Sequence, residues 1–221
     1  MTKEHPIRFS GAMVRAILDD RKTQTRQIMK PQPTPGLDGW DWSWPIPGKN
    51  VTPGTFDRWR ADAKNPLSPR YCPYGKPGDR LWVRETHRAV YPQDPTYNGG
   101  EPIEYDYRAT YKPGDRLCDP TRWTPSIHMP RAACRLVLEV TRVRVERLND
   151  CSFEDALAEG IPDYRQMLTE QCTHGESADA CARRLRWPQR QYALLWDEIN
   201  GAGAWEANPW VWVVEFRRVQ P

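Results

Sequence analysis

A lysine and a threonine standing three residues apart are the first residues in this sequence whose types could do chemistry together. Lys22 and Thr25 lie in the polar segment at residues 21–27, which follows a run of helical spacing and has no hydrophobic pattern of its own. A threonine hydroxyl becomes a nucleophile when a base takes its proton. A lysine can be that base only if burial or a neighbouring cation lowers its pKa. The alternative is that both are ordinary surface residues.

Three further charged residues stand out by position. Glu159 falls in the last turn of a short predicted helix, where the helix dipole disfavours an acid. Arg84 and Glu85 directly follow the apolar segment at residues 81–83. Each of these has an ordinary reading as a solvated charge, and from spacing alone that reading is favoured over a catalytic one.

Other catalytic and metal-binding patterns do not occur in the sequence. It contains no GxSxG, HExxH, P-loop or GxGxxG motif. Cys172, His174 and Cys181 lie close together, but their spacing matches no standard zinc ligand set, so an ordinary surface loop is favoured. We therefore predict neither a metal nor a cofactor.

Composition limits the class of protein. The 221 residues carry a formal charge of only +3, too little for a protein that coats DNA generally. The 11 tryptophans and 32 basic residues still allow a local groove that combines base stacking with phosphate contacts, although for any one tryptophan packing is the better interpretation. No segment has the apolar length of a signal peptide or a membrane span, so we expect a cytoplasmic protein with reduced cysteines and no membrane partner.

Hydrophobic spacing and capping residues predict an irregular order of elements. We predict a strand at residues 6–9, a helix from Ser10 to Asp20, an extended segment at 21–27, strands at 81–85 and 103–111, a long strand at 135–147, a helix from Ser152 to Gly160, a helix at about 192–199 that ends at Gly201, and a strand at 209–216. Strands and helices do not alternate regularly, which argues against a doubly wound parallel sheet.

The long strand at residues 135–147 changes phase in its middle. Leu138 and Val140 share one parity, whereas Val143 and Val145 share the other. A shift of one residue moves side chains to the opposite face, so we predict a β-bulge at residues 141–142. Bent strands suit a small barrel. The sequence therefore favours a single α+β domain over residues 1–221, built on a mostly antiparallel β-barrel with flanking helices.

Two segments are predicted to be elaborations of this domain. Residues 31–70 hold many prolines and four tryptophans, which favours a long ordered loop or flap over helices and central strands. Residues 161–188 are polar and irregular, and we expect a second loop there.

Four sequence pieces, taken in order, resemble the ASCH domain family of PUA-like fold, in particular members encoded by bacteriophages and prophages. They are RKTQTR after the first helix, PGDRLWVRE, the helix SFEDALAEG, and the final NPWVWVVEF. The resemblance spans nearly the whole chain and implies a small β-barrel with a cleft suited to RNA or a nucleoside, in the cytoplasm of a bacterial or phage-infected cell.

The resemblance also implies site residues. Some small bacterial members are amidohydrolases that cleave N(4)-acetylcytidine, and their proposed catalytic lysine, threonine and glutamate fall on Lys22, Thr25 and Glu159. The usual glycine two residues before the lysine is Asp20, and the chain is about twice as long as these enzymes, which bears on substrate identity. As candidate substrate-binding residues we take the neighbouring polar and aromatic side chains Arg26, Trp82, Arg84 and Glu85.

Three hypotheses follow. The first is an amidohydrolase in which Thr25 attacks the amide of an acylated cytosine nucleoside, Lys22 carries the proton, and Glu159 orients Lys22 or holds the base. The second is a non-catalytic module that binds RNA, or less favourably single-stranded DNA, through the arginines of residues 135–147 and the tryptophan-rich flap. The third is an accessory protein that binds another protein through this flap.

Overall fold

The computed structural model describes residues 2–30, 32, 34–35, 41–45, 56–60, 72–92, 101–111, 115, 123–162 and 177–219. Its helices are α1 (Gly11–Leu18), α2 (Phe153–Ala158), α3 (Ala178–Leu185) and α4 (Trp187–Asn200). Its strands are β1 (Glu4–Arg8), β2 (Gln24–Ile28), β3 (Thr34–Pro35), β4 (Asp41–Pro45), β5 (Phe56–Arg60), β6 (Arg80–Arg84), β7 (His87–Val90), β8 (Glu104–Tyr107), β9 (Val137–Arg147) and β10 (Trp210–Val219). The predicted mixed α+β class is confirmed.

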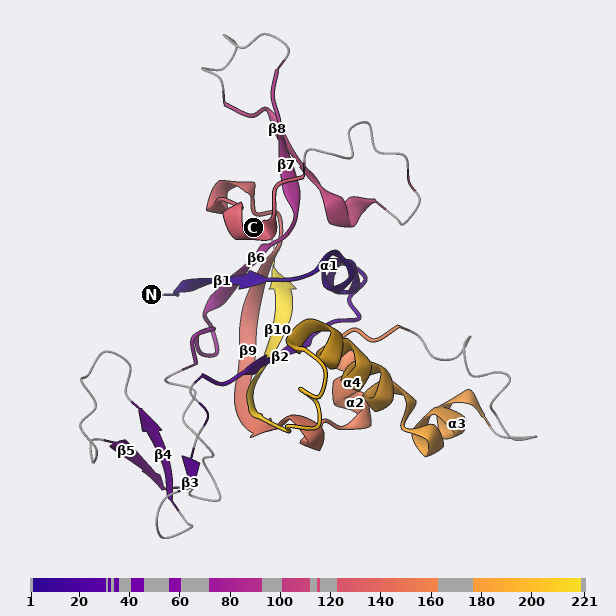
Figure 1. Cartoon of the computed structure of the whole chain (residues 1–221). Helices are drawn as coiled ribbons and strands as arrows, with labels where there is room; N and C mark the ends of the chain where they lie inside the picture. Colours follow the sequence, from indigo (N-terminus) through magenta and orange to yellow (C-terminus); the bar gives the residue numbers. More distant parts are fainter. Residues whose placement is uncertain are drawn as a thin grey trace.

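A five-stranded sheet forms the centre of the molecule, in the order β1-β6-β9-β10-β2 (Figure 1). Only the pair β1–β6 is parallel, and the other three pairs are antiparallel. In the described part of the chain no backbone ladder joins β1 to β2, so the predicted closed barrel is not confirmed. Instead, α1 connects these two edge strands, and its Val14 and Ile17 pack into the same core as Ile7 of β1. A helix thus covers the gap that a barrel would close by hydrogen bonds.

The predicted bulge in β9 is confirmed. Arg142 pairs with Glu215, whereas Val140 pairs with Phe216, so Thr141 is the extra residue. The apolar residues before and after the bulge lie in one core cluster despite their opposite parity in the sequence: Leu136, Leu138, Val140, Val143 and Val145. The bulge therefore keeps both halves of the longest strand turned toward the same core.

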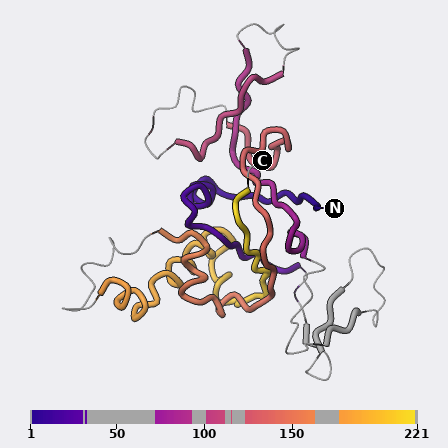
Figure 2. Tube along the Cα trace, turned by 180° about the vertical axis from the view of Figure 1, so that it is seen from behind, coloured from indigo at the N-terminus to yellow at the C-terminus, as the bar shows by residue number. Residues whose placement is uncertain are grey.

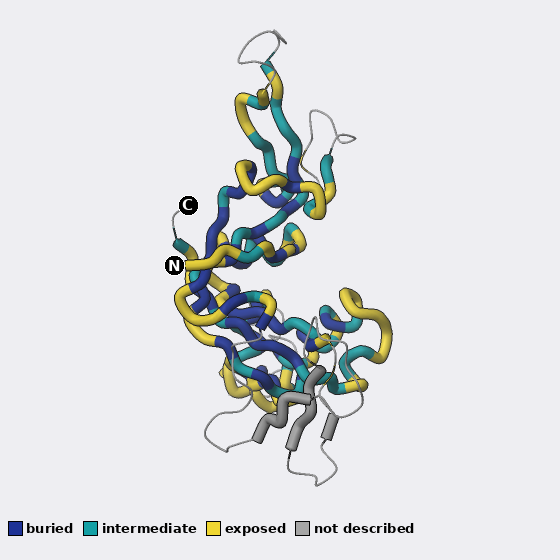
Figure 3. The backbone as a smooth tube through the Cα atoms, turned by 90° about the vertical axis from the view of Figure 1, so that its left-hand side faces the viewer, coloured by how far each residue is buried: buried dark blue, intermediate teal, exposed yellow. Residues whose placement is uncertain are grey.

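Strand β10 is buried on both faces, as the apolar sequence of its first half predicts. Trp212 and Val214 face the core that α1 covers, and Val211 and Val213 face a second core formed with α2 and α4. Figure 3 shows the buried positions gathered in these central strands. The helix α4 confirms the predicted amphipathic helix and ends at Gly201 as expected.

Edge strand β2 lies where the α1 side and the α4 side of the molecule meet. Among the described strands it pairs with β10 alone. The helices α2 and α4 pack together beside it, and α1 lies next to α4 (Figure 1). The β7–β8 hairpin points away from the sheet in both Figure 1 and Figure 2. The site described below lies on the β2 side, on the opposite part of the molecule from the tip of this hairpin.

The two predicted loop elaborations contain regular structure. Within residues 31–70, β3, β4 and β5 form a three-stranded antiparallel sheet. Pro35 and Pro45 are the last residues of β3 and β4, where the missing N–H disturbs a ladder least, so proline does not exclude strands here. Within residues 161–188, α3 begins after Ser177, whose side chain accepts from the N–H of Ala180. The polar composition concealed this helix, because it buries only a narrow side.

No helix in the described ranges combines the length and the apolar character needed to span a bilayer.

Deleting Thr141 tests the role of the bulge. Without this residue, one half of β9 must turn its valines away from the core, and burying each valine contributes about 1.5–3 kcal/mol. We expect the free energy of unfolding to fall by at least about 3 kcal/mol in a denaturant titration. The control is Thr141→Ala, which keeps the residue count at an exposed position and should change stability by less than about 0.5 kcal/mol. Equal stability of the two variants would contradict the role of the bulge.

Candidate functional site

Lys22 is held in place by the backbone on both of its sides. Asp20 adopts a left-handed conformation with φ of 56°, which turns the chain out of α1. The N–H groups of Arg21 and Lys22 then both donate to the carbonyl of Ala16, at 2.8 and 3.0 Å. An isolated antiparallel bridge pairs Lys22 with Glu159. Backbone contacts alone therefore fix the position of Lys22, independently of its side chain.

The ammonium of Lys22 is fully buried and fully bonded. Its Nζ donates to Glu159 Oε2 at 2.8 Å, to the Glu159 carbonyl at 3.0 Å and to the Gln24 carbonyl at 2.9 Å. Its side chain is 0% exposed and that of Glu159 is 3% exposed. The structure thus brings together two of the three candidate catalytic residues, which are 137 positions apart in the sequence.

Glu159 is the C-cap residue of α2, and its contacts explain an acid at this unfavourable end of a helix. Its two carboxylate oxygens bind two buried cations, which outweighs the small cost from the helix dipole. The next residue, Gly160, has φ of +90°, and a Cβ there would lie 2.9 Å from the Cβ atoms of both Ala16 and Lys22. Only glycine therefore lets α2 approach α1 and Lys22 this closely.

Arg26 is the second buried cation. Its Nη1 donates to Glu159 Oε1 at 3.0 Å, its Nε donates to Glu146 at 3.1 Å, and its guanidinium lies 5.9 Å from the centroid of the Tyr192 ring. Burial by itself would lower the pKa of Arg26, but the nearby carboxylates, Glu159 first, raise it above its ordinary value. Arg26 is permanently charged and holds Glu159 from the side opposite to Lys22.

The ion pairs extend across the sheet face beneath α2. Val213 of β10 pairs with Arg26 of β2 on one side and with Arg144 of β9 on the other. Arg144 donates to Glu146 at 2.9 Å and to Asp155 at 2.6 Å, and it also bonds Glu215. Two arginines and their carboxylates thus form one connected layer that attaches α2 to β2, β9 and β10.

Asp155 shows the effect of this layer on ionisation. Burial alone would raise the pKa of Asp155. The N–H and side chain of Ser152, the charge of Arg26 and the hydrogen bond from the Gln24 side chain outweigh burial and lower this pKa to about 2. Ser152 and Asp155 also form a capping box at the start of α2. The helix that carries Glu159 is therefore tied to an ionised Asp155.

Thr25 lies on the opposite face of β2 from Arg26, because successive side chains of a strand alternate. It is 2% exposed, and its Oγ1 accepts from Gln27 Nε2 at 3.5 Å. The hydroxyl of Tyr74 in turn donates to Gln27 Oε1 at 3.3 Å. Among the hydrogen bonds of the described residues, none joins Lys22 Nζ to Thr25 Oγ1. The two residues share one short segment without being in direct contact.

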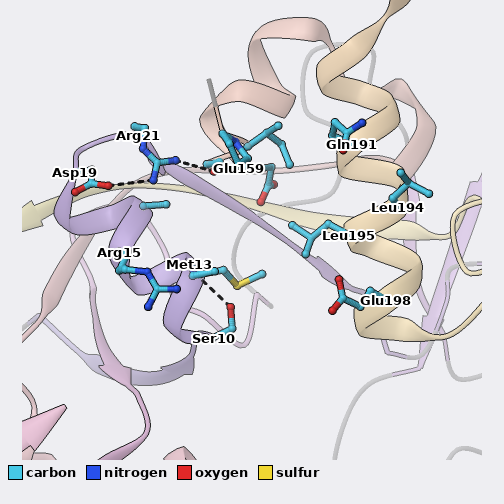
Figure 4. Close-up of a pocket in the computed structure, with 15 residues that line it drawn as sticks. Ser10, Met13, Arg15, Asp19, Arg21, Glu159, Gln191, Leu194, Leu195 and Glu198 are labelled. Atoms are coloured by element: carbon cyan, nitrogen blue, oxygen red, sulfur yellow. Dashed lines mark hydrogen bonds and ion pairs between the residues drawn. The ribbon is translucent and has the colours of Figure 1, made fainter. Parts of the chain in front are cut away.

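Three cavities surround the site, and Met13 of α1 lines all of them. A cavity of about 490 Å³ lies between α1 and α4, with Glu159 among its walls (Figure 4). A cavity of about 60 Å³ is lined by Thr25, Arg26 and Glu159. A third, of about 720 Å³, is lined by Gln27 and Tyr74. Figure 4 shows Met13 on α1 and Leu195 on α4 on opposite sides of the space in front of Glu159.

The other predicted substrate-binding residues lie elsewhere. Glu85 is 1% exposed, and both of its carboxylate oxygens accept from Arg135 at 2.9 Å. Trp82 packs against a separate cluster around Met129 and supports Arg84 from 5.3 Å. Neither Glu85 nor Trp82 lines the three cavities, whereas Arg84 lines the largest of them. The sequence places Trp82, Arg84 and Glu85 next to one another, but it does not indicate that their side chains lie in separate environments.

Sequence reasoning missed the polar residues that support Lys22 and Glu159. They are Gln24, Glu146, Arg144, Asp155, Glu215 and Tyr192. One signal was available: Gln24 and Arg26 alternate in β2, as Arg144 and Glu146 do in β9. Alternation of charged residues in two strands that flank an apolar strand indicates one ionic face, but the register needed to align them depends on the bulge.

The candidate zinc set receives no support. Cys172 and His174 lie outside the described residues, and Cys181 is buried beside Phe153 and Ala182. Within the ranges that the structure describes, no group of three metal-ligating side chains comes together. Cys72, Cys134 and Cys151 are buried free thiols.

Comparison of the chain with protein-family models, with curated proteins and with solved structures finds no match.

Glu159→Ala tests whether this carboxylate compensates the buried cations. Removing it leaves the fully buried Lys22 ammonium without its charged partner, which typically costs about 3–5 kcal/mol. We expect a loss of that size in the free energy of unfolding measured by denaturant titration. The double variant Lys22→Met/Glu159→Leu should recover most of it, since both charges are removed.

The matched control for this experiment is Glu154→Ala on the same helix. Glu154 is 67% exposed and pairs with Arg183, which is 60% exposed, so its removal should change stability by less than about 1 kcal/mol. If Glu159→Ala is as stable as Glu154→Ala, the buried network does not hold α2 in place.

Asp155 should make stability depend on acid pH. Its pKa is lower in the folded chain than in the unfolded chain, so its contribution is fully present above its ordinary value of 3.8 and is lost as the pH falls toward about 2. The contribution amounts to about 2 kcal/mol. The difference in unfolding free energy between the natural chain and Asp155→Asn should therefore shrink steadily between these two pH values. A difference that stays constant over this range would show that Asp155 is not selectively ionised in the fold.

Proposed function

We propose that this protein is an amidohydrolase acting on an N-acylated cytosine nucleoside or a related modified base, on a PUA-like scaffold. The observation that carries the proposal is the 2.8 Å contact between Lys22 Nζ and Glu159 Oε2, because Glu159 also lines a cavity between α1 and α4. The family resemblance picks out these two residues for catalysis from segments far apart in the sequence. Structural ion pairs also exist in proteins, but the carboxylate of this one lines a cavity of about 490 Å³.

The proposed reaction uses Thr25 as the nucleophile. Lys22 first passes one ammonium proton to Glu159. The Oγ1 of Thr25 then attacks the carbonyl carbon of the acyl group, while the neutral Lys22 amine takes the hydroxyl proton and returns it to the leaving amine. The acyl group, held as an ester on Thr25, is then released by water. Glu159 orients Lys22 throughout. Gln27 Nε2 donates to Thr25 Oγ1 at 3.5 Å, and in this proposal it turns its N–H to the oxyanion that develops on the acyl group.

Substrate binding must rearrange Lys22 for this reaction to proceed. All three protons of the ammonium are engaged, by Gln24 and twice by Glu159. One of these hydrogen bonds has to break before Lys22 can contact Thr25. Glu159 Oε2, which lies 2.8 Å from Lys22 Nζ, accepts the proton that Lys22 gives up. Catalytic hydrogen bonds often form only when the substrate is bound. A ligand that enters beside Met13 would be next to Thr25 and Glu159, which line a cavity together with Met13.

Two of the arginines on which RNA binding through residues 135–147 would rely are already paired with acids, whereas the side chain of Arg142 is 68% exposed. Arg135 is paired with Glu85, and Arg144 is paired with Glu146 and Asp155. Arginines already neutralised by carboxylates release few counterions on meeting a phosphate backbone. The tryptophan-rich flap, on which this alternative also relied, falls outside the side chains that the structure describes.

The hydrolase proposal predicts a specific dependence on the Thr25 hydroxyl. Purified protein should convert N(4)-acetylcytidine to cytidine, detected by chromatography, and Thr25→Val should reduce kcat by at least about 100-fold. Valine matches threonine in shape, so the loss reports the hydroxyl and not packing. Thr25→Ser keeps a hydroxyl and should retain measurable activity.

Lys22→Met is the companion variant, with folding verified by thermal denaturation. It should be inactive while still binding cytidine. Full activity in both Thr25→Val and Lys22→Met would contradict the proposed roles, even if the natural chain releases cytidine.

A further inference from the structure

The largest of the three cavities is lined by two arginines that are direct neighbours. Arg8 of β1 and Arg84 of β6 are register partners in the parallel pair. Adjacent strands lie about 4.8 Å apart, so both side chains leave the same face of the sheet at the same level. Like charges placed directly opposite each other on a sheet are destabilising unless something neutralises them.

Nothing within the described residues neutralises this pair. Arg84 donates to the carbonyl of Ile127 and lies over Trp82, and neither contact involves a carboxylate. Its Nε is buried without a hydrogen-bond partner. Arg8 is exposed and has no acidic neighbour within ion-pair distance in this part of the chain. Six other arginines, all outside this cavity, are paired with acids in Arg26–Glu146, Arg88–Asp106, Arg131–Glu4, Arg135–Glu85, Arg144–Asp155 and Arg217–Glu139.

The remaining wall of this cavity is rich in donors and has no acid. None of its lining residues is an aspartate or glutamate. Its polar members besides the two arginines are Ser10, Gln27, Tyr74, Thr86 and Ser126. A cavity of about 720 Å³ with two cations, several hydroxyls and no carboxylate has the chemistry of an anion site.

The anion site adjoins the catalytic candidates. Gln27 lines this cavity and also donates toward Thr25, and Met13 is shared with the cavities that contain Thr25 and Glu159. An extended ligand can therefore have one end at Arg8 and Arg84 and the other at Thr25. We propose that Arg8 and Arg84 bind a phosphate group, so that a nucleotide, free or within a strand, binds more tightly at this site than the corresponding nucleoside.

This inference rests on the proposed function for the identity of the base but not for the phosphate. The test therefore measures binding of the reaction product, which needs no turnover. Cytidine 5′-monophosphate, cytidine and a single-stranded oligocytidine RNA are titrated into the full chain by calorimetry, at low and at physiological ionic strength.

We expect the monophosphate to bind at least about tenfold more tightly than cytidine, since hydrogen bonds to a charged group contribute about 1.5–3 kcal/mol each. Arg8→Gln and Arg84→Gln should each remove about tenfold of that affinity and leave cytidine binding unchanged. Arg84→Lys, which keeps the charge but loses the planar fork, should lie between. Arg80→Gln is the matched control, because Arg80 is exposed on the same strand but does not line the cavity.

The RNA distinguishes the two sources of phosphate. Tighter binding of the RNA than of the monophosphate, weakened by the same two substitutions, identifies a base within a strand as the substrate. Equal or weaker binding of the RNA identifies a free nucleotide.

Two results would overturn the phosphate site: no preference of the protein for either phosphorylated ligand over cytidine, or Arg8→Gln and Arg84→Gln binding the monophosphate as Arg80→Gln does. Because Arg8 is exposed, its substitution does not threaten folding, and thermal denaturation checks Arg84→Gln. A failure of the hydrolase assay would leave the binding difference intact, so the two proposals can fail separately.

Discussion

The need to neutralise buried charge determines how this molecule is assembled around β2. Lys22 and Arg26 lie in the interior, where an unpaired cation would cost several kcal/mol, and both are bonded to the same carboxylate of Glu159. This shared acid positions the end of α2 against the strand. Asp155, one turn earlier, holds Gln24 and Arg144 in the same way. The short helix is therefore fixed more by ionic contacts than by its few apolar side chains.

The layer of ion pairs around β2 also leaves room for a ligand. The two hydrophobic cores lie on opposite faces of β10, and β2 separates them at the edge of the sheet. Apolar side chains on β2 would let the cores merge and fill the space between α1 and α4. Polar side chains with fixed partners cannot collapse in this way, so the cavities around Met13 persist. Lys22 and Glu159, which stabilise this layer of ion pairs, are also residues for which we propose a catalytic role.

Sequence reasoning succeeded where a local pattern had one physical explanation. The change of parity in β9 required a bulge, and the capping residues Ser10 and Ser152 marked helix starts. It failed where the answer depended on tertiary register. The open edge between β1 and β2, and the pairing of Arg8 with Arg84, arise from which strands are neighbours. Composition also misled, since prolines at strand ends concealed β3 and β4.

The strand order has a consequence for how the chain folds during synthesis. The only ladder partner of β2 in the described sheet is β10, so residues 24–28 cannot join the sheet until residues 210–219 have been synthesised. Contacts between such distant segments form slowly, because a long loop must close first. Until then Lys22 and Arg26 face water. During synthesis, residues 24–28 therefore leave the ribosome well before their strand partner, and Thr25 and Arg26 take their places in the sheet only after residues 210–219 have been made.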